Sequence, residues 1–400
     1  MADEKKTVLL CVTGCIATYK SCEILRLLQK SGYRVKVLMS EHATQFVGPT
    51  TFRALTHEKV AVGLFDDPED PIHHISLAQE ADIVLVAPAT ANIIAKMANG
   101  LADDLISTTL LATRAPIVVA PAMNAGMWEA AATQENIETL KRRGVTIIQP
   151  DSGYLACGEV AAGRLPEPVQ IAEQTIDILE GSSELAGERV LITAGPTHEP
   201  IDPVRYIANR SSGKMGIALA REAKRMGAAV TLVLGPSNEP VPHGINVVRV
   251  QTAQEMLDAV TTAFEHATMA ILAAAVADYT PANPADHKLK KAHERLDSIE
   301  LTETVDILAA LSANKGGRTV IGFAAETNDV LDHAQAKLAR KGCDAILAND
   351  VSRTDAGFAS SQNRAWWITK SGTEDLGLVE KDQLAHTILL KSAEIKDCQK

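Results

Sequence analysis

The stretch TVLLCVTGC, residues 7–15, decides how the first part of the chain folds: a run of apolar residues leads directly into a glycine. The stretch RVLITAGPT, residues 189–197, repeats this arrangement. An apolar run that does not alternate with polar residues is typical of a strand that is buried on both faces, as in a parallel sheet covered by helices. The sequence therefore predicts two units, each of which begins with a buried strand and a turn.

More apolar runs of strand length follow each of these stretches. They are RVKVLMS, DIVLVAPA, PIVVAPAM and VTIIQP in the first half, and AVTLVLG, INVVRVQT, MAILAAAVAD, TVIGFAAE and CDAILAND in the second. Segments of helical period separate them, and one of these ends at Gly32, as a helix C-cap should. We therefore expect two doubly wound, mostly parallel-sheet, Rossmann-like α/β domains, with ligands at the carboxyl ends of the strands.

Length, charge and cysteine content restrict the number of domains, the class of function and the compartment. Four hundred residues exceed what one hydrophobic core usually organises, and we place the domains at 1–181 and 188–400 with a linker at 182–187. The net charge of -11 argues against a general nucleic-acid or membrane-surface binder. No apolar run approaches the roughly 18 residues of a membrane span, and the acidic N-terminal segment does not resemble a signal peptide. Six cysteines without a CxxC pair favour a reduced, cytoplasmic compartment.

The two common nucleotide-binding motifs are absent. No GxGxxG follows the first strand of either half. The segment SSGKMG, residues 211–216, is not a Walker A motif, because the first glycine of that motif would fall at Ala208 and Met215 replaces its Ser or Thr. A nucleotide must therefore be bound, if at all, by another pattern.

Longer motifs carry a resemblance to known families. TGCIATYK, HHISLAQEADIVLVAPATANIIAKMANGLADD, PAMNAGMW and SGYLACG resemble flavin-dependent cysteine decarboxylases, which have a flavodoxin-like fold. ITAGPTHEPIDPVRYIANRSSGKMG, AAVADY, KLKK, GFAAET and AND resemble phosphopantothenate–cysteine ligases. In this order, and over essentially the whole chain, they are similar to the bifunctional bacterial family phosphopantothenoylcysteine decarboxylase/phosphopantothenate–cysteine ligase, which acts in coenzyme A synthesis.

The resemblance implies two reactions. The C-terminal domain would join 4'-phosphopantothenate to L-cysteine with CTP and Mg²⁺, because a carboxylate must be activated, here as an acyl-cytidylate, before it forms an amide. The N-terminal domain would decarboxylate the product to 4'-phosphopantetheine. FMN would provide the electron sink for this step by accepting hydride from the thiol-bearing carbon. The family also implies a homododecamer in which ligase dimers join decarboxylase trimers.

Three residues of the first domain match catalytic positions of the family. His74 would act as a base or orient the carboxylate, Asn124 would donate to the carboxylate, and Cys157 would donate a proton from a glycine-rich loop able to close as a lid. The residues alone leave alternatives open: a structural histidine, an Asn that caps a helix, and a buried structural cysteine. We interpret His73 as a bystander, and no metal ligands are assigned.

The resemblance also implies which residues hold FMN. They follow the predicted strands, where small residues and hydroxyls permit close backbone approach and hydrogen bonds to a phosphate. Relatives often have Gly or Ser where this chain has Cys15, so a hydroxyl is lost there while the backbone N–H groups remain. The matching positions are Gly14, Cys15, Ile16, Ser40, Thr90, Asn92 and Ala122.

In the second domain, Asn209 matches the residue that carries the acyl intermediate forward, and Lys288 matches a catalytic lysine in an exposed loop. Ser211, Ser212 and Gly213 lead into a predicted helix, where we expect the phosphate of phosphopantothenate, although a plain N-cap would give the same pattern. The resemblance assigns the nucleotide site to Asp278, Lys288, Asp306, Ile307, Phe323, Lys337 and Lys341. The last two are spaced i, i+4 and face the same way, as on an ordinary solvated helix.

A different class of function remains as an alternative: a flavin-binding regulatory protein that kept the fold and lost catalysis. Such a protein needs no thiol chemistry, so the joint presence of His74, Asn124, Cys157, Asn209 and Lys288 favours the enzyme. A flavin decarboxylase of peptidyl cysteine would leave the second half of the chain unexplained.

Overall fold

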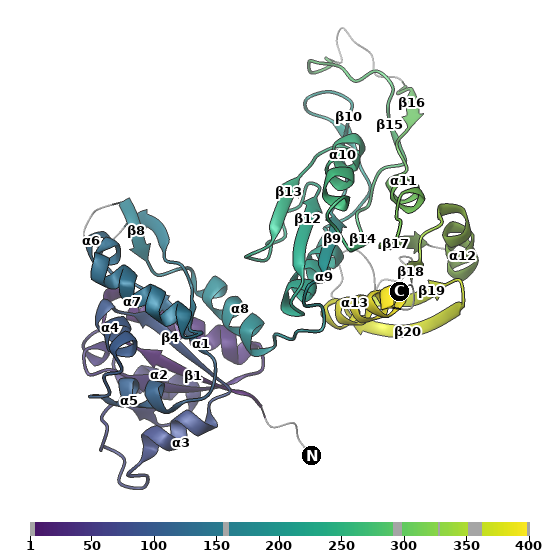
Figure 1. Ribbon diagram of the computed structural model, residues 1–400. Helices are drawn as coiled ribbons and strands as arrows, with labels where there is room; N and C mark the ends of the chain where they lie inside the picture. The colour runs from purple at the N-terminus through teal and green to yellow at the C-terminus, as the bar shows by residue number, and fades with distance from the viewer. Residues whose placement is uncertain (1–4, 155–159, 291–297, 327–328, 351–361, 398–400) are drawn as a thin grey trace. The chain divides into compact units, whose positions relative to one another are not determined.

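The computed structural model describes residues 5–154, 160–290, 298–326, 329–350 and 362–397. The chain divides into two compact units, Met1–Gly181 and Ser182–Lys400, which are drawn in Figure 1 and described separately below.

The first unit is built on a six-stranded sheet in the order β3-β2-β1-β4-β5-β6. Every neighbouring pair is parallel. This is the doubly wound order, and without the two-residue edge strand β3 it becomes the flavodoxin-like order. The predicted strands are confirmed, whereas β3 is too short to be found from its sequence. The strands are β1 (Thr7–Val12), β2 (Arg34–Met39), β3 (Val60–Ala61), β4 (Ile83–Ala89), β5 (Ile117–Pro121) and β6 (Thr146–Ile147).

Helices cover both faces of this sheet. One core cluster packs the sheet against α1, α2 and α8, and another packs it against α4, α5 and α7. Strands β1 and β4 are buried along their whole length, as their continuous apolar sequences predict. The helices are η1 (Ile16–Tyr19), α1 (Lys20–Lys30), η2 (Ala43–Gln45), α2 (Pro49–Thr56), α3 (His73–Glu80), α4 (Ala91–Asn99), α5 (Leu105–Ala112), α6 (Ala125–Glu129), α7 (Ala131–Arg142) and α8 (Pro168–Leu179).

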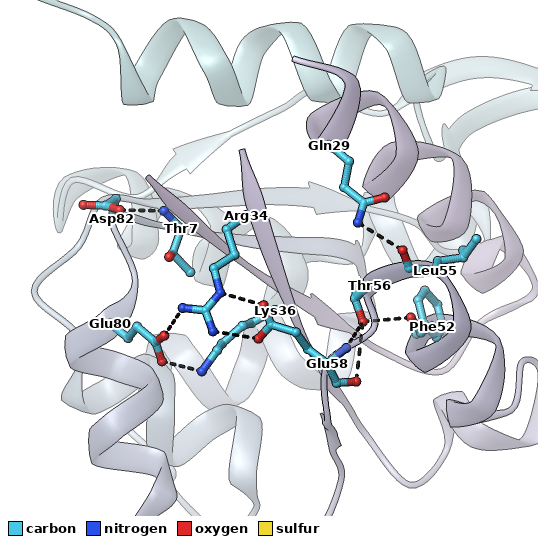
Figure 2. A network of polar contacts seen from close by, with 10 residues as sticks. All are labelled: Thr7, Gln29, Arg34, Lys36, Phe52, Leu55, Thr56, Glu58, Glu80 and Asp82. Carbon is cyan, nitrogen blue, oxygen red and sulfur yellow. Dashed lines mark hydrogen bonds and ion pairs between the residues drawn. The ribbon is translucent and has the colours of Figure 1, made fainter. Parts of the chain in front are cut away.

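Ion pairs tie down the amino ends of the strands, opposite the edge where ligands are expected (Figure 2). The Arg34 guanidinium at the start of β2 binds both oxygens of Glu58, at 2.6 and 2.9 Å. Its other nitrogen pairs with Glu80 at the end of α3, and Lys36 pairs with the same carboxylate. The Asp82 carboxylate accepts from the Thr7 N–H at 2.6 Å, joining the starts of β1 and β4. These contacts fix the helix ends to the sheet.

The glycine-rich segment near the end of the first unit is not simply a loop. Strands β7 (Asp151–Tyr154) and β8 (Val160–Arg164) pair antiparallel, and the residues between them lie outside the described part. Gly163 has φ +123°, and a Cβ there would lie 2.4 Å from the Met123 carbonyl oxygen. The Met123 N–H donates to the Gly163 carbonyl at 3.0 Å. The sequence prediction of a loop is therefore wrong for the two arms, which pair with each other, and β8 also contacts Met123 just after β5.

The second unit repeats the same order and extends it. Its eight-stranded sheet runs β13-β12-β9-β14-β17-β18-β19-β20. The first six strands are parallel, and β19 and β20 add antiparallel at one edge. The strands of this sheet are β9 (Arg189–Ala194), β12 (Ala229–Leu234), β13 (Asn246–Arg249), β14 (Met269–Leu272), β17 (Thr319–Glu326), β18 (Ala345–Asp350), β19 (Gln362–Thr369) and β20 (Gly372–Glu380).

Helices again pack on both faces of the sheet. One cluster joins the sheet to α9 and α13, and the other joins it to α10, α11 and α12. The helices are α9 (Lys214–Arg225), α10 (Ala253–Phe264), α11 (Ile307–Ala313), α12 (Val330–Lys341) and α13 (Lys381–Asp397). Two small antiparallel pairs complete the unit: β10 (Glu199–Pro200) with β11 (Tyr206–Ile207), and β15 (Tyr279–Pro281) with β16 (Leu301–Glu303).

The segment 182–187 packs with the second unit. The Ser182 N–H donates to the Arg225 carbonyl at 2.9 Å, and the Leu185 N–H donates to the Met226 carbonyl at 2.8 Å. Leu185 is buried in the core beside α9. Within the described residues, no helix combines the length and apolar character that a membrane crossing requires.

Candidate active sites

The carboxyl edge of the first sheet gathers the residues predicted to hold a flavin. Parallel strands end at a common edge, so turns that are far apart in sequence meet there. The strand order reverses between β1 and β4, which makes their ends the expected binding crevice. Gly14, Cys15 and Ile16 follow β1, Ser40 follows β2, Thr90 and Asn92 follow β4, and Ala122 follows β5.

Thr13, which the sequence analysis did not single out, holds this crevice together. Its hydroxyl donates to the Pro88 carbonyl at 2.7 Å and accepts from the Thr90 N–H at 3.0 Å. The side chain is buried, and the two bonds join the end of β1 to the end of β4. The sequence feature that could have identified Thr13 is its position as the first residue of the TGCIATYK motif, directly after β1.

The turn after β1 packs closely against the turn after β2. A Cβ at Gly14 would lie 2.5 Å from the Cβ of His42, so a larger residue would push this turn away from the turn after β2. Cys15 is half-buried, and burial raises the pKa of its thiol, which keeps it neutral. Ile16, the first residue of η1, is 62% exposed at this edge.

The other strand ends supply hydroxyls and the start of a helix. The Thr90 hydroxyl accepts from the Ile93 N–H at 3.4 Å and caps α4. Asn92 is exposed in the first turn of that helix. The Ser40 hydroxyl accepts from the Ala43 N–H at 3.2 Å, and Ala122 is buried. Backbone N–H groups at a helix start suit a phosphate, so these residues fit the cofactor that the sequence predicts.

The two histidines at the start of α3 each carry an unsatisfied ring nitrogen. Nδ1 of His74 and Nε2 of His73 are buried and have no hydrogen-bond partner in the described part of the chain. His73 is the more deeply buried, and its Nδ1 lies 3.8 Å from Asp67. Because α3 precedes β4 in a parallel sheet, it starts at the carboxyl edge. A buried polar atom that lacks a partner is costly, so the His74 nitrogen suits a ligand.

Asn124 begins α6, and its Oδ1 accepts from the Gly126 N–H at 2.9 Å. The capping role that the sequence left open is thus present, and the proposed contact with a substrate carboxylate would come in addition to it. Cys157 lies outside the described residues. In the β8 arm of the hairpin, the Gly163 carbonyl accepts from the N–H of Met123, the residue before Asn124.

The second unit has a cavity of about 860 Å³ at the carboxyl edge of its sheet. It lies where the strand order reverses, between the end of β9 and the segment after β14. It is lined by residues from the ends of β17 and β18 and from the starts of α9, α11 and α13. It brings together most of the residues predicted for this domain: Asn209, Asp278, Asp306, Ile307, Phe323, Lys337 and Lys341.

Polar contacts order the side of this cavity near α11 and α12. Asp306 caps α11 by accepting from the Ala309 N–H at 3.0 Å. Its other oxygen pairs with Lys341, and the Lys337 ammonium donates to the Phe323 carbonyl at 2.8 Å. The i, i+4 lysines of α12 therefore both reach the cavity wall, and Lys341 has a carboxylate beside it that a nucleotide or a metal ion could contact.

Close backbone packing shapes the middle of the cavity. A Cβ at Gly216 would lie 2.5 Å from the Ala194 Cβ, so the start of α9 can pack directly on the end of β9. The Asn209 amide donates to the Val276 carbonyl at 2.8 Å, which links the α9 side to the segment after β14. The Ser212 hydroxyl accepts from the Lys214 N–H at 3.4 Å.

Lys288 is not among the residues that line the cavity. Lys288 is exposed in a loop. The next residue, Leu289, makes two backbone hydrogen bonds: the Leu289 N–H donates to Asp202, and the Leu289 carbonyl accepts from Arg205. The hydrogen bond from Arg205, aided by backbone N–H groups, holds the pKa of the Asp202 carboxyl well below its usual range. The structure anchors the base of this loop outside the cavity.

Sequence reasoning also missed several polar residues that line the cavity, among them Asn349, Asn363 and Lys381. Asn349 lies in the AND motif, and its Oδ1 is buried without a partner in the described segments. The described residues contain no group of three or more His, Cys, Asp or Glu side chains that could hold a metal ion.

The two units match two protein families. Residues 1–180 match the family described as Flavoprotein, and residues 185–395 match the DNA/pantothenate metabolism flavoprotein C-terminal domain. The Coenzyme A biosynthesis bifunctional protein CoaBC of Bacillus subtilis (strain 168) is 45% identical over 394 residues, 97% of each chain. The Escherichia coli (strain K12) protein of the same name is 44% identical over 388 residues, 96% of each chain. A solved C-terminal domain of a CoaBC protein is 40% identical, with a TM-score of 0.46, and covers 54% of this chain and 100% of its own.

Proposed function

Because this chain belongs to the family of bifunctional coenzyme A biosynthesis proteins, we propose that it ligates 4'-phosphopantothenate with L-cysteine and then decarboxylates the product to 4'-phosphopantetheine. The observation that carries the proposal is the match over 97% of both chains to a relative named for this bifunctional role. Each half has its own family match, so one half supplies the decarboxylase and the other the ligase.

We propose CTP as the nucleotide and Mg²⁺ as the metal ion that accompanies it. In the cavity of the second unit, Lys337 and Lys341 would neutralise phosphate charge, and the metal would bind Asp278 or Asp306, two of the carboxylates that line the cavity. The substrate carboxylate would attack the α-phosphate and displace pyrophosphate, giving an acyl-cytidylate. Asn209 would hold the acyl group while the cysteine amine displaces CMP and the amide forms.

Two further roles in the ligase site remain proposals. The serines before α9 would bind a phosphate through their hydroxyls and the backbone N–H groups of the helix start. Lys288 would reach the nucleotide from its exposed loop, which needs the loop to move about its anchor at Leu289. A lysine on a long flexible stem suits such a role.

For the decarboxylase we propose FMN, held at the carboxyl edge by Gly14, Cys15, Ile16, Ser40, Thr90, Asn92 and Ala122. The cofactor supplies the electron sink that loss of carbon dioxide needs. The unsatisfied Nδ1 of His74 would bind or orient the substrate carboxylate, and the Asn124 amide would donate to it. Cys157 would return a proton to the product.

We further propose that the protein acts in the cytoplasm on small molecules, binds neither nucleic acid nor membrane, and assembles as a homododecamer from decarboxylase trimers and ligase dimers. The acidic net charge supports the part of this proposal that concerns nucleic acid and membrane. Mass measurement of the purified protein in solution tests the assembly.

The function is tested by mass spectrometry of the purified protein with 4'-phosphopantothenate, cysteine, CTP and Mg²⁺. We expect the wild type to form 4'-phosphopantetheine. Cys157→Ser should form the ligated product and stop at an oxidised or unsaturated species, whereas Asn209→Ala should give no amide. A wild type that binds FMN but forms neither product would instead identify the regulatory protein that lost catalysis.

A further inference from the structure

The loop that follows β15 is held at two points by the turn between β10 and β11. Strand β10 contacts β15 (Figure 1). In the segment 282–290, Ala285 and Leu289 are half-buried and the other residues are exposed. The Ala285 N–H donates to the Ile201 carbonyl at 2.9 Å, and the Leu289 N–H donates to Oδ2 of Asp202 at 3.2 Å. The loop is therefore attached to this turn at both of its half-buried residues.

Asp202 is a buried carboxylate whose two oxygens are both engaged, since only 2% of the residue is exposed. Its Oδ1 accepts from the N–H groups of Val204 and Arg205, each at 2.8 Å. Its Oδ2 accepts from Nε of Arg205 at 2.9 Å as well as from the Leu289 N–H. Nη2 of Arg205 in turn donates to the Leu289 carbonyl at 2.9 Å. A satisfied buried polar network is rigid, so a pre-ordered Asp–Arg pair holds both backbone groups of Leu289.

The hydrogen bond from Asp202 acts on the peptide unit next to Lys288. The Leu289 N–H belongs to the planar peptide bond between Lys288 and Leu289, so this bond fixes the unit that carries the Lys288 Cα. Consecutive Cα atoms are about 3.8 Å apart, which leaves the Lys288 Cα little room to move while Leu289 is held. The side chain of Lys288 is exposed, and its long stem can still turn. The backbone is thus fixed while the ammonium group keeps its reach.

The two strand pairs that carry this attachment also border the large cavity. Strand β15 begins directly after Asp278, and β16 ends at Glu303; both residues line the cavity. Asn209, which follows β11, lines it too. Strand β15 is three residues long, so the loop leaves it about 10 Å from the cavity edge. The turn that holds Leu289 is therefore placed relative to the cavity by the same elements that place Asn209 and Asp278.

We propose that Asp202 is a positioning residue of the ligase site: it holds the peptide unit beside Lys288, so that this lysine reaches the nucleotide from a fixed point. The inference rests on the ligase function and on the role of Lys288 proposed above. A group that stabilises a transition state must be placed within about 0.5 Å, and a misplacement of about 1 Å can cost roughly 100-fold in rate. Without the bond to Asp202, the loop would present Lys288 at many positions, of which few are productive.

The inference is tested by the rate of pyrophosphate release from the full-length protein with saturating CTP, 4'-phosphopantothenate and Mg²⁺, and without cysteine, so that the first step of ligation is observed alone. Asp202→Ala removes the acceptor of the Leu289 N–H, whereas Asp202→Asn keeps an oxygen that can accept from it. Asp344→Asn is the matched control, because Asp344 also pairs with a cation, Lys315, and accepts from a backbone N–H, that of Val320 at 2.8 Å. Asp344 precedes β18, at the sheet edge opposite the cavity.

We expect Asp202→Ala to slow pyrophosphate release about 10- to 100-fold, and Asp202→Asn to recover part of this loss. The control, which is remote from the loop, should stay within about twofold of wild type. Hydrogen exchange in peptides from 282–290 should be faster in Asp202→Ala and unchanged in the control. A wild-type rate in Asp202→Ala, or an equal loss of rate in the control, overturns the inference.

The deciding comparison is made in a Lys288→Met background. A positioning residue acts through the group that it positions, so adding Asp202→Ala should slow the Lys288→Met protein no further. A general loss of stability would instead slow both backgrounds by the same factor, and that result overturns the inference. A Lys288→Met protein with the wild-type rate refutes the role of the lysine and the inference with it. A wild type that releases no pyrophosphate refutes the ligase function itself.

Discussion

Replacing Thr13 by Val should open the proposed flavin crevice of the first unit, because Val has the same shape but lacks the hydroxyl that joins β1 to β4. The Pro88 carbonyl would keep only the weaker bond from the Thr13 N–H at 3.3 Å, and the Thr90 N–H would lose its acceptor at 3.0 Å. One lost hydrogen bond and one unsatisfied, half-buried N–H together cost about 2–3 kcal/mol. That free energy raises the local opening constant roughly 30- to 150-fold.

The effect is measured by hydrogen exchange with mass spectrometry on the full-length protein, using peptides from β1 and β4. Peptides from β9 in the second unit serve as an internal reference. Thr13→Ser keeps the hydroxyl and loses a methyl group, so we expect it to lose about 1 kcal/mol or less. We also expect Thr13→Val to bind FMN more weakly, because Thr90 is one of the predicted cofactor residues. If the Val and Ser variants exchange alike and bind flavin alike, the hydroxyl does not hold the crevice.

Three more predictions concern the second unit. Gly216→Val should abolish nucleotide binding and lower the melting temperature, because a Cβ there would lie 2.5 Å from that of Ala194. A nucleotide affinity equal to that of the wild type, measured by calorimetry, would contradict this. Asp306→Asn and Lys341→Met should each weaken CTP binding about tenfold. Because the two residues form an ion pair, a double variant should bind CTP only slightly more weakly than either single variant. Strictly additive losses of binding free energy would argue for separate roles. A hydrogen bond from a neighbouring guanidinium lowers the pKa of the Asp202 carboxyl, so its stabilisation is present above about pH 4 and lost as the pH falls. The melting temperature of Asp202→Asn should therefore lie below wild type at neutral pH and converge with it in acid, and a gap independent of pH would refute this.

The sheets were predictable because the strands are apolar without interruption. Residues 7–12 and 83–89 are buried on both faces. A strand buried in this way needs apolar residues at successive positions, so its sequence is a continuous hydrophobic run. The β7–β8 hairpin has no such apolar run. Its arms are held by backbone pairing and by the close approach of Gly163 to Met123. The antiparallel strands β19 and β20 were missed because β19 begins with the polar residues Gln362, Asn363 and Arg364, and exposed acidic residues interrupt the apolar pattern of β20.

The residues of the candidate active sites also differ in whether the sequence could predict them. Phe323 lies in the GFAAET motif, the resemblance implies Asp306 and Lys341, and the fold brings all three to one cavity. Lys381 lies outside any motif, and its position is set by the packing of α13 on α9, which local sequence does not specify. Lys288 is the opposite case: it lies in the KLKK motif, but it is exposed and does not line the cavity.

Each unit closes its own hydrophobic core, and in the described residues no core cluster mixes side chains from the two. A lesion in one site should therefore leave the other catalytically intact. Two copies of the gene, one inactivated at Asn209 and the other at His74, should complement each other in the same cell, with the ligated intermediate passing between them by diffusion. The rate of that rescue, compared with one intact copy, would measure how much the cell gains from having both activities on a single polypeptide.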